Sequence, residues 1–257
     1  MKKNKFNKKP QATTKHNHLW LYGKHAVMTA IENERRKIFR ILTSGESFPQ
    51  KILETIKNRN IVIENVPKSE IDSLLTSDAV HQGVAAEVAF LDNYPLEDLC
   101  SDSGSKLIVI LDQVTDPHNI GAIMRSAAAF NADAVIVPDK NTCQETGVLA
   151  KSASGALDTV PFIRVANLAN AMDTLKKNDF WIIGLDGKCD KELSQIDITA
   201  KTAIVLGSEG DGIRRLILEN CDFVAKLPIS EKIESLNVSN AAAVALYEIA
   251  SKRKSFE

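Results

Sequence analysis

The chain has 257 residues, of which 44% are hydrophobic and 25% are charged, and its formal net charge is -1. This composition is ordinary for a folded globular protein, and it excludes a mostly disordered, collagen-like or coiled-coil chain. At about 150 residues per domain, the length predicts one large or two modest domains.

Several features argue against a secreted, membrane-bound or metal-binding protein. The longest apolar runs, such as Leu107–Leu111, fall far short of the roughly 18 residues that a membrane-spanning helix needs. The basic N-terminus has no apolar segment behind it, so we expect no secretory signal. The four cysteines are widely spaced, and the five histidines do not pair with them at ligand spacing. We therefore expect a cytoplasmic protein with reduced thiols, no metal and no membrane contact.

Charge is unevenly distributed along the chain. Six of the 32 basic residues are lysines within residues 1–18, which contain no acidic residue; the other 26 share the rest of the chain with 33 acidic residues. We predict that residues 1–18 form a basic disordered tail. Such a tail either stays solvated or contacts nucleic-acid phosphates.

Residues 19–91 alternate between helical and strand patterns, which predicts a small α/β unit. The expected helices are Lys24–Asn33, Gln50–Asn60 and Ser69–Ser77, and the expected strands are Phe39–Ser44, Ile61–Val66 and Val84–Phe90. Residues 92–105 are rich in proline, aspartate, serine and glycine, which is typical of a linker and marks the domain boundary.

Residues 106–257 repeat the alternation with more strongly apolar strands. The expected strands are Leu107–Leu111, Ala134–Pro138, Val160–Val165, Phe180–Leu185, Ala203–Gly207 and Ala225–Ile229. Near-continuous apolar strands joined by helices predict a parallel sheet covered on both faces. Ligands of such sheets bind beyond the carboxyl ends of the strands, so the segments that follow the strands are candidate sites.

The segment after the first of these strands reads D-Q-V-T-D-P-H-N-I-G-A-I-M-R-S. Asn119 can cap the helix that follows or contact a ligand. Gly121 allows another backbone or a ligand to approach closely. Arg125 lies further along the same helix, as a solvated side chain or a functional one. His118 is either exposed or a proton shuttle.

The segment after strand Ala203–Gly207 reads G-S-E-G-D-G and can wrap closely around a ligand. It is not the G-x-G-x-x-G fingerprint, which argues against a nicotinamide-dependent dehydrogenase. Glu209 would repel bound phosphates, so a pyrophosphate cradle is not expected either. Arg214 and Arg215 open the next helix and are expected as surface charges.

A third segment combines Leu227–Ser230 with Ser235–Asn240 ahead of an alanine-rich helix. One polar side chain would suffice to cap that helix, yet five polar hydroxyl or amide residues are present. This surplus predicts a site as well as a cap.

Together the three segments resemble the motifs of the SpoU (TrmH) family, whose members are S-adenosylmethionine-dependent RNA ribose 2'-O-methyltransferases. The motifs are N-I-G-A-x-x-R-S from Asn119, V-L-G-S-E-G-D-G-I from Val205, and L-P-I from Leu227 followed by S-L-N-V-S from Ser235. They occur in the family's order, and the resemblance covers about residues 106–252. Residues 21–27 and 81–84 are similar to that family's substrate-binding domain.

The resemblance implies an α/β fold of two domains. Residues 106–257 would form a parallel-sheet catalytic domain with a SPOUT-type trefoil knot. Residues 19–91 would form a small ribosomal-protein-like substrate-binding domain. The resemblance also implies a homodimer with its sites at the subunit interface, and S-adenosylmethionine bound in the knot. The backbone groups that would hold this cofactor belong to Leu206, Gly207, Leu227, Ile229 and Leu236.

The family's catalytic set corresponds to Asn119, Arg125, Glu209, Ser235 and Asn237. An arginine stays protonated in proteins, so we favour Arg125 as the group that grips a substrate phosphate and stabilises a developing alkoxide. The proton would leave through phosphate, water or Glu209. Alternatively, Glu209 only orients Asn119.

The two-domain layout is similar to the branch of the family that methylates a guanosine ribose in 23S rRNA, which makes 23S rRNA the expected partner. A tRNA ribose 2'-O-methyltransferase of the same family and a non-catalytic RNA-binding ribosome-assembly factor are the alternatives. With only 5% aromatic residues, extensive base stacking is not expected. RNA contacts are expected instead from the tail, Lys24 and the cluster Arg35–Lys37, which could also be a solvated helix end. Asn240 departs from the apolar residue expected there, which would affect packing.

Overall fold

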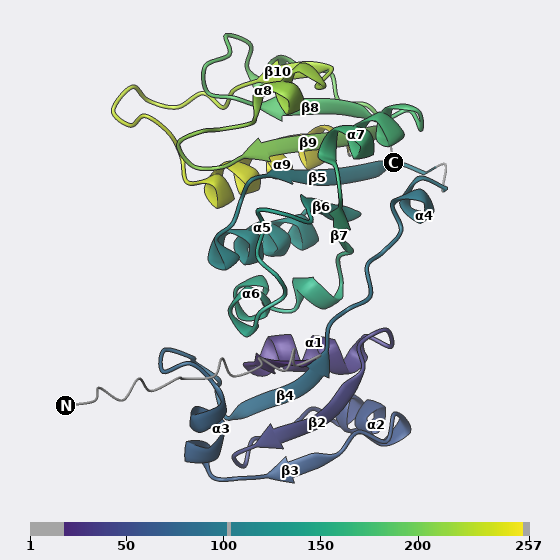
Figure 1. The fold of residues 1–257 in the computed structure, drawn as a ribbon, viewed down its shortest axis with the longest axis vertical. Helices are drawn as coiled ribbons and strands as arrows, with labels where there is room; N and C mark the ends of the chain where they lie inside the picture. The colour runs from purple at the N-terminus through teal and green to yellow at the C-terminus, as the bar shows by residue number, and fades with distance from the viewer. Residues whose placement is uncertain (1–17, 102–103, 254–257) are drawn as a thin grey trace, which may run out of the picture.

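The computed structural model describes residues 18–101 and 104–253, which form two sheets joined through a shared apolar core (Figure 1). The predicted tail, apart from its last residue, lies outside the described residues. His18 begins the first strand.

The N-terminal sheet has the strand order β1-β4-β2-β3. Its strands are β1 (His18–Tyr22), β2 (Ile38–Thr43), β3 (Ile63–Asn65) and β4 (Val84–Ala89). Its helices are α1 (Lys24–Glu32), α2 (Gln50–Asn58) and α3 (Lys68–Leu74). β4 pairs antiparallel with β1 and β2, whereas β3 pairs parallel with β2. All predicted elements of this unit are present, and β1 is an additional strand.

The C-terminal sheet is parallel throughout, with the strand order β10-β8-β9-β5-β6-β7. Its strands are β5 (Lys106–Asp112), β6 (Ala134–Pro138), β7 (Phe162–Val165), β8 (Trp181–Leu185), β9 (Lys201–Gly207) and β10 (Phe223–Ala225). β5 and β9 lie side by side in the middle, with Asp112 opposite Gly207.

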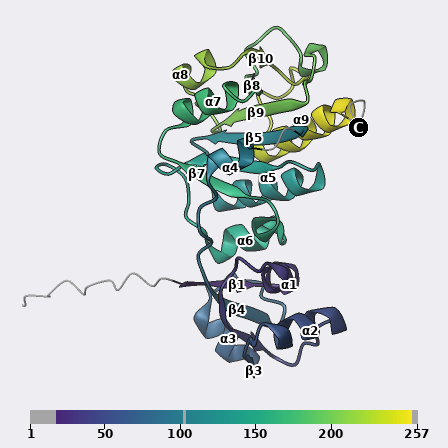
Figure 2. The same ribbon diagram turned by 90° about the vertical axis from the view of Figure 1, so that its right-hand side faces the viewer.

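Helices cover both faces of the parallel sheet, as predicted (Figure 2). α5 (Pro117–Ala129) and α9 (Val238–Arg253) share one apolar cluster with alternate residues of the strands. α4 (Leu96–Cys100), α7 (Leu168–Lys176) and α8 (Arg215–Glu219) share the cluster on the other face. The remaining elements are α6 (Gly147–Ala153) and the short 3-10 helices η1 (Ala156–Asp158) and η2 (Leu193–Gln195).

One segment contains a helix that the sequence did not predict, and one strand differs from its predicted bounds. The segment expected as a linker contains α4, because its Leu96 and Leu99 are buried against the parallel sheet despite their polar neighbours. The last strand is Phe223–Ala225 rather than Ala225–Ile229. After Ala225 the chain leaves β8, because Lys226 pairs instead with Glu192, and Pro228 has no N–H to donate to a ladder.

The two sheets are joined by a continuous core rather than by the connecting segment alone. Val27 and Ile31 of α1 belong to the same buried cluster as Leu149 and Ala153 of α6. Helices α1 and α6 therefore form the layer between the two sheets, as Figure 1 shows, and η1 packs against both of them.

An ion cluster centred on Arg36 holds this junction. Arg36 is fully buried, and its guanidinium donates to Asp158 at 2.8 Å, to Glu145 at 2.7 Å and to the Ala89 carbonyl at 2.9 Å. Although burial lowers the pKa of Arg36, the charges of Asp158 and Glu145 raise it above its ordinary value. The expectation that Arg36 contacts RNA is therefore wrong, because its donors are used inside the protein.

Removing one partner from this cluster should destabilise the fold. Asp158→Ala leaves the buried guanidinium short of a counter-charge, so we expect the free energy of unfolding to fall by about 3–5 kcal/mol. The measurement is denaturant unfolding. The matched control is Glu219→Ala, which breaks the exposed ion pair with Arg215 and should cost less than about 1 kcal/mol. Equal losses in both variants would contradict a structural role for the cluster.

Candidate active site

The turn between β5 and α5 frees one candidate side chain for other contacts. Asp116, rather than Asn119, caps α5, because its carboxylate accepts the backbone N–H of His118 at 3.0 Å and Pro117 follows in the first turn. Asn119 lies inside that first turn, so its side-chain amide is not used as the cap. A Cβ on Gly121 would lie 2.5 Å from Ser152 Cβ, so the close neighbour predicted there is helix α6.

The loop after β9 folds back tightly on the end of its strand. Two backbone hydrogen bonds between Ser208 and Gly212, of 3.2 and 3.1 Å, close it. A Cβ on Gly207 would lie 2.0 Å from the carbonyl carbon of Gly212, so the loop tolerates only glycine at this point. The fold of the loop presents Glu209 as an exposed side chain at its turn.

A buried carboxylate that the sequence analysis missed fixes the far end of this loop. Asp112, fully buried at the end of β5, accepts the backbone N–H of Arg214 at 2.9 Å and pairs with its guanidinium at 2.7 Å. Arg214 is therefore an anchor of the loop and not the free surface charge that we expected. The sequence did contain a signal for this anchor, because an aspartate stands at the end of an apolar strand.

Asn237 serves a helix and the site at once. Its side-chain oxygen accepts the backbone N–H of Ser239 at 2.9 Å and the Ser239 hydroxyl at 2.6 Å, which caps the start of α9. Its side-chain nitrogen donates to Asn119 Oδ1 at 3.0 Å and to Glu209 Oε1 at 2.5 Å. The surplus of polar residues predicted here thus has a second purpose.

The three segments meet in one amide–carboxylate cluster formed by Asn119, Glu209 and Asn237. Besides the two bonds from Asn237, Asn119 Nδ2 donates to Glu209 Oε1 at 3.1 Å. One carboxylate oxygen therefore receives two charge-assisted hydrogen bonds, which fix the rotamers of all three side chains. The cluster is accessible to solvent, so its arrangement can meet a polar ligand.

Other predicted site residues lie outside this cluster. The side chains of Arg125 and Ser235 are exposed, and no hydrogen bond or ion pair joins them to the residues that the structure describes. Leu206 is buried at the end of β9, next to Gly207. The other three predicted cofactor contacts, Leu227, Ile229 and Leu236, lie in the segment between β10 and α9.

Two further residues from the sequence motifs have structural partners. His118 Nδ1 lies 3.2 Å from the Ser152 hydroxyl of α6. Asn240 is exposed at the start of α9, so the expected effect on packing is wrong because its side chain does not enter the core.

Burial makes three of the four cysteines poor nucleophiles. All four are free, and burial raises the pKa of Cys100 and Cys143 and raises that of Cys221 to about 12. Within residues 18–101 and 104–253, no three histidine, cysteine, aspartate or glutamate side chains gather as metal ligands would. None of the helices in those ranges is long and apolar enough to cross a membrane.

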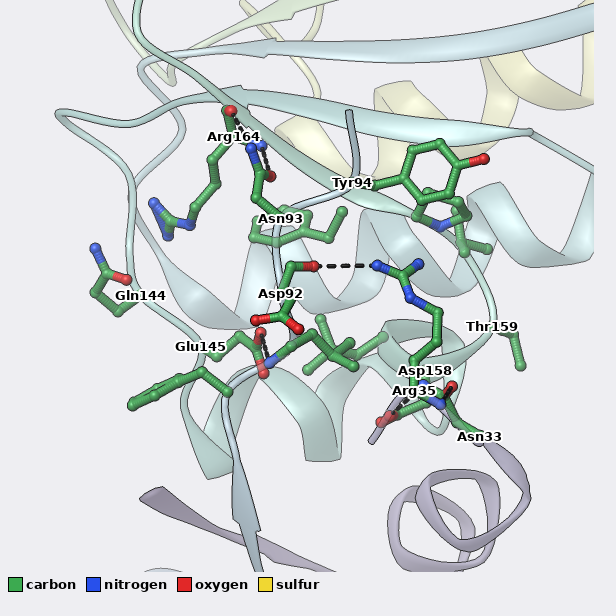
Figure 3. Close-up of a pocket in the computed structure, with 16 residues that line it drawn as sticks. Asn33, Arg35, Asp92, Asn93, Tyr94, Gln144, Glu145, Asp158, Thr159 and Arg164 are labelled. Atoms are coloured by element: carbon green, nitrogen blue, oxygen red, sulfur yellow. Dashed lines mark hydrogen bonds between the residues drawn. The ribbon is translucent and has the colours of Figure 1, made fainter. Parts of the chain in front are cut away.

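A separate cavity of about 250 Å³ lies at the junction of the two sheets (Figure 3). Its lining comes from the N-terminal unit, from the segment after β4 and from the loops around η1 and β7. No candidate catalytic or cofactor-binding residue lines it. Sequence reasoning gave no sign of this cavity.

Two family models match the chain. The SpoU rRNA methylase family matches residues 106–247, and the RNA 2'-O ribose methyltransferase substrate-binding family matches residues 20–94. Together they span nearly all of the described residues, and the boundary between them falls in the segment that carries α4.

Known proteins are similar over almost the whole chain. The 23S rRNA (guanosine-2'-O-)-methyltransferase RlmB of Xylella fastidiosa is 39% identical, over 91% of this chain and 96% of its own. YacO of Bacillus subtilis, named for the TrmH family of tRNA/rRNA methyltransferases, is 35% identical over 92% of this chain and 96% of its own. The SpoU methyltransferase AviRb of Streptomyces viridochromogenes, solved with AdoMet, has the same fold, with a TM-score of 0.80 at 24% identity over 93% of this chain and 91% of its own.

The geometry of the loop after β9 predicts the effect of a single methyl group. Gly207→Ala forces the loop away from the strand end, so we expect the free energy of unfolding to fall by about 1–3 kcal/mol. Gly187→Ala is the control, because a Cβ at that exposed position meets no atom within 4 Å. Thermal and denaturant unfolding of both variants measures the difference, and a neutral Gly207→Ala would show that the loop has room to spare.

Proposed function

The chain belongs to the SpoU family of RNA methyltransferases, and on that premise we propose that it transfers a methyl group from S-adenosylmethionine to the ribose 2'-hydroxyl of a guanosine in 23S rRNA. The observation that carries this proposal is the assembly of Asn119, Glu209 and Asn237 from three separate motifs into one hydrogen-bonded cluster. The similarity to RlmB over both parts of the chain supports the substrate.

The alternatives differ in substrate or in chemistry. A tRNA substrate remains the second candidate, because the name of the Bacillus relative includes both RNA classes. A non-catalytic assembly factor is disfavoured. Such a factor has no need to orient Glu209 with two amide groups, and an exposed polar cluster of this kind gives nothing to the core.

The residues around the cluster fit S-adenosylmethionine, which supplies an activated methyl group on a sulfonium. Gly207 and Gly212 approach closely in this loop, and Glu209 of the loop is bonded to Asn237, which directly follows the segment that contains Leu227, Ile229 and Leu236. In residues 227–236 the described backbone hydrogen bonds are limited to one turn, from the Ile233 N–H to the Ser230 carbonyl. The other backbone groups there can hold an adenosine moiety, and Glu209 suits a cationic ligand.

The remaining chemistry concerns the proton of the ribose hydroxyl. Asn119 and Asn237 hold Glu209 in place, which leaves its second oxygen available to accept a proton directly or through water. Arg125 stays protonated, so we assign it to gripping a substrate phosphate and stabilising the developing alkoxide. Ser235 is assigned to substrate contact at the edge of the same segment.

Arg125 is not joined to the cluster, and we infer that it serves the site of a partner copy in a homodimer. Arg125 projects from α5 into solvent, and the neighbouring helix α9 exposes Val244 and Tyr247 by 49% and 62%. Tyr247 contacts Phe130 at the end of α5. A partner covering this apolar surface would bring its own Asn119 and Glu209 near Arg125.

The finer architecture is also part of the proposal. Residues 106–257 are assigned as the catalytic domain, with a trefoil knot through the loops after β9 and β10. Residues 19–91 are assigned as the RNA substrate-binding domain, preceded by the basic tail and followed by the connecting segment 92–105. The substrate assigns the enzyme to the cytoplasm, where rRNA is made and assembled in bacteria.

The first experiment measures transfer of labelled methyl from S-adenosylmethionine to total RNA from cells that lack this gene. We expect alkali-stable label in large-subunit rRNA, at a guanosine. Label in tRNA would overturn the substrate while keeping the chemistry. An absence of label in every RNA, with cofactor binding intact, would overturn the assignment as an enzyme acting on mature RNA.

Mixing two inactive variants tests whether Arg125 acts across the dimer. Arg125→Ala and Glu209→Gln should each lower kcat by about 100- to 1000-fold. After subunit exchange at equal amounts, half of the dimers contain one intact site, so about a quarter of wild-type activity should return. If Arg125 acted within its own chain, every site in the mixture would be defective and no activity would return.

A further inference from the structure

At the end of the N-terminal sheet where β1 and β2 begin, cationic side chains lie over aromatic rings. Lys37 Nζ lies 5.1 Å from the centre of the Phe39 ring, and the Arg40 guanidinium lies 5.4 Å from that of Trp20. The ring of His18 meets Phe39 edge-on at 6.2 Å. We name these five residues the cation–aromatic ledge.

The backbone links the ledge to the junction cavity through the end of β4. Ala89 lies opposite His18 in the sheet, and its backbone N–H donates to the Lys37 carbonyl at 2.9 Å. The next residue, Phe90, lines the cavity and is 40% exposed. Phe39, on the ledge, is 42% exposed. Phe39 and Phe90 are therefore two exposed aromatic rings, one on the ledge and one in the lining of the cavity.

The cavity, like the ledge, contains cationic side chains that lie over aromatic rings. Arg35 lies over the ring of Tyr94 at 5.2 Å and donates to the Asp92 carbonyl, as Figure 3 shows. Arg164 lies over Phe162 at 5.6 Å, and its Nη1 is buried without a hydrogen bond. At about 250 Å³ the cavity is smaller than the roughly 300–1,000 Å³ of sites for drug-sized ligands. Its size suits one planar ring system.

The charges favour stacking over a simple phosphate clamp. Arg40 is neutralised by Glu87 and Glu64, at 2.7 and 3.4 Å. Asp92, Glu145 and Asp158 also line the cavity, although the last two are used by Arg36. Lys37 has no ion pair with any described residue. The phosphates of an RNA would thus meet few unpaired cations here. Its uncharged bases would meet exposed rings and guanidinium planes.

We propose that the cation–aromatic ledge and the junction cavity bind a single-stranded segment of the RNA substrate, with bases stacked on Phe39 and Phe90 and one base in the cavity. Single-stranded RNA is read by stacking of splayed bases on aromatic rings and arginine planes. This inference rests on the proposed function, because it requires an RNA substrate.

The ledge should govern affinity and not the chemical step. Figure 1 places the chain's passage from β4 to α4 on the opposite side of the molecule from the loops that follow β9 and β10. Those loops carry the amide–carboxylate cluster. Variants of the ledge should therefore raise KM for RNA and leave kcat unchanged.

Paired substitutions separate stacking from charge. The measurement is equilibrium binding of a single-stranded fragment of large-subunit rRNA at several salt concentrations. Phe39→Ala should weaken binding by about 5- to 100-fold, with an unchanged slope of log affinity against log salt. Lys37→Ala should reduce that slope by about 0.7, the amount expected for one phosphate contact with single-stranded RNA. Far-UV circular dichroism and cofactor binding establish that each variant is folded.

Matched controls come from α2, on the other face of the same sheet. Leu53 is 40% exposed there, and Lys57 is an exposed lysine. Leu53→Ala and Lys57→Ala should leave affinity and salt slope at wild-type values. Equal effects of ledge and control variants would overturn the proposal.

The cavity is tested by filling it. Gln144 is an exposed residue of its lining, so Gln144→Trp should obstruct the cavity and raise KM, whereas Gln144→Ala should not. Wild-type affinity in Phe39→Ala and Gln144→Trp would overturn the inference. So would a change of oligomeric state in Phe39→Ala on sedimentation, which would make the ledge an interface between copies. If the wild type binds this RNA but methylates none, the proposed function fails while the ledge stands.

Discussion

The parallel pairing of β5 with β9 is the constraint on which the rest of the site depends. Because Asp112 stands opposite Gly207, the two chain segments leave the sheet side by side, although they are about a hundred residues apart in sequence. The buried Asp112 then ties the second segment back at Arg214. The pairing of β5 with β9 and the anchoring of Arg214 by Asp112 together bring Asn119 close to Glu209. Asn237 completes the cluster from the segment between β10 and α9.

The cluster also shows how a polar site can be ordered without a buried charge. Each of its side-chain groups has a second task or a second partner: Asn237 caps a helix with its oxygen and positions Glu209 with its nitrogen. Helix formation and site assembly are therefore coupled, since the start of α9 is set by the residue that orients the carboxylate. Preorganisation of this kind lowers the cost of fixing catalytic groups when substrate binds.

Local sequence patterns predicted the helices and strands well where a strand is buried along its whole length. The apolar runs of the parallel sheet and its helical cover were correct, as were the three motif segments. The sequence could not reveal contacts that depend on distant partners. Arg36 is indistinguishable from its exposed neighbours until Glu145 and Asp158, more than a hundred residues away, surround it. Likewise, Leu96 and Leu99 looked like isolated apolar residues in a polar linker, and the order of strands has no local signature.

The burial of Arg36 has a consequence for how such enzymes diversify. Its two carboxylate partners belong to the other unit of the chain, and α1 shares a core with α6. A substrate-binding unit without an arginine at this place would leave Glu145 and Asp158 in the junction without their counter-charge. The two units are therefore coupled through a buried ion cluster, and an exchanged unit has to bring the residues that complete it.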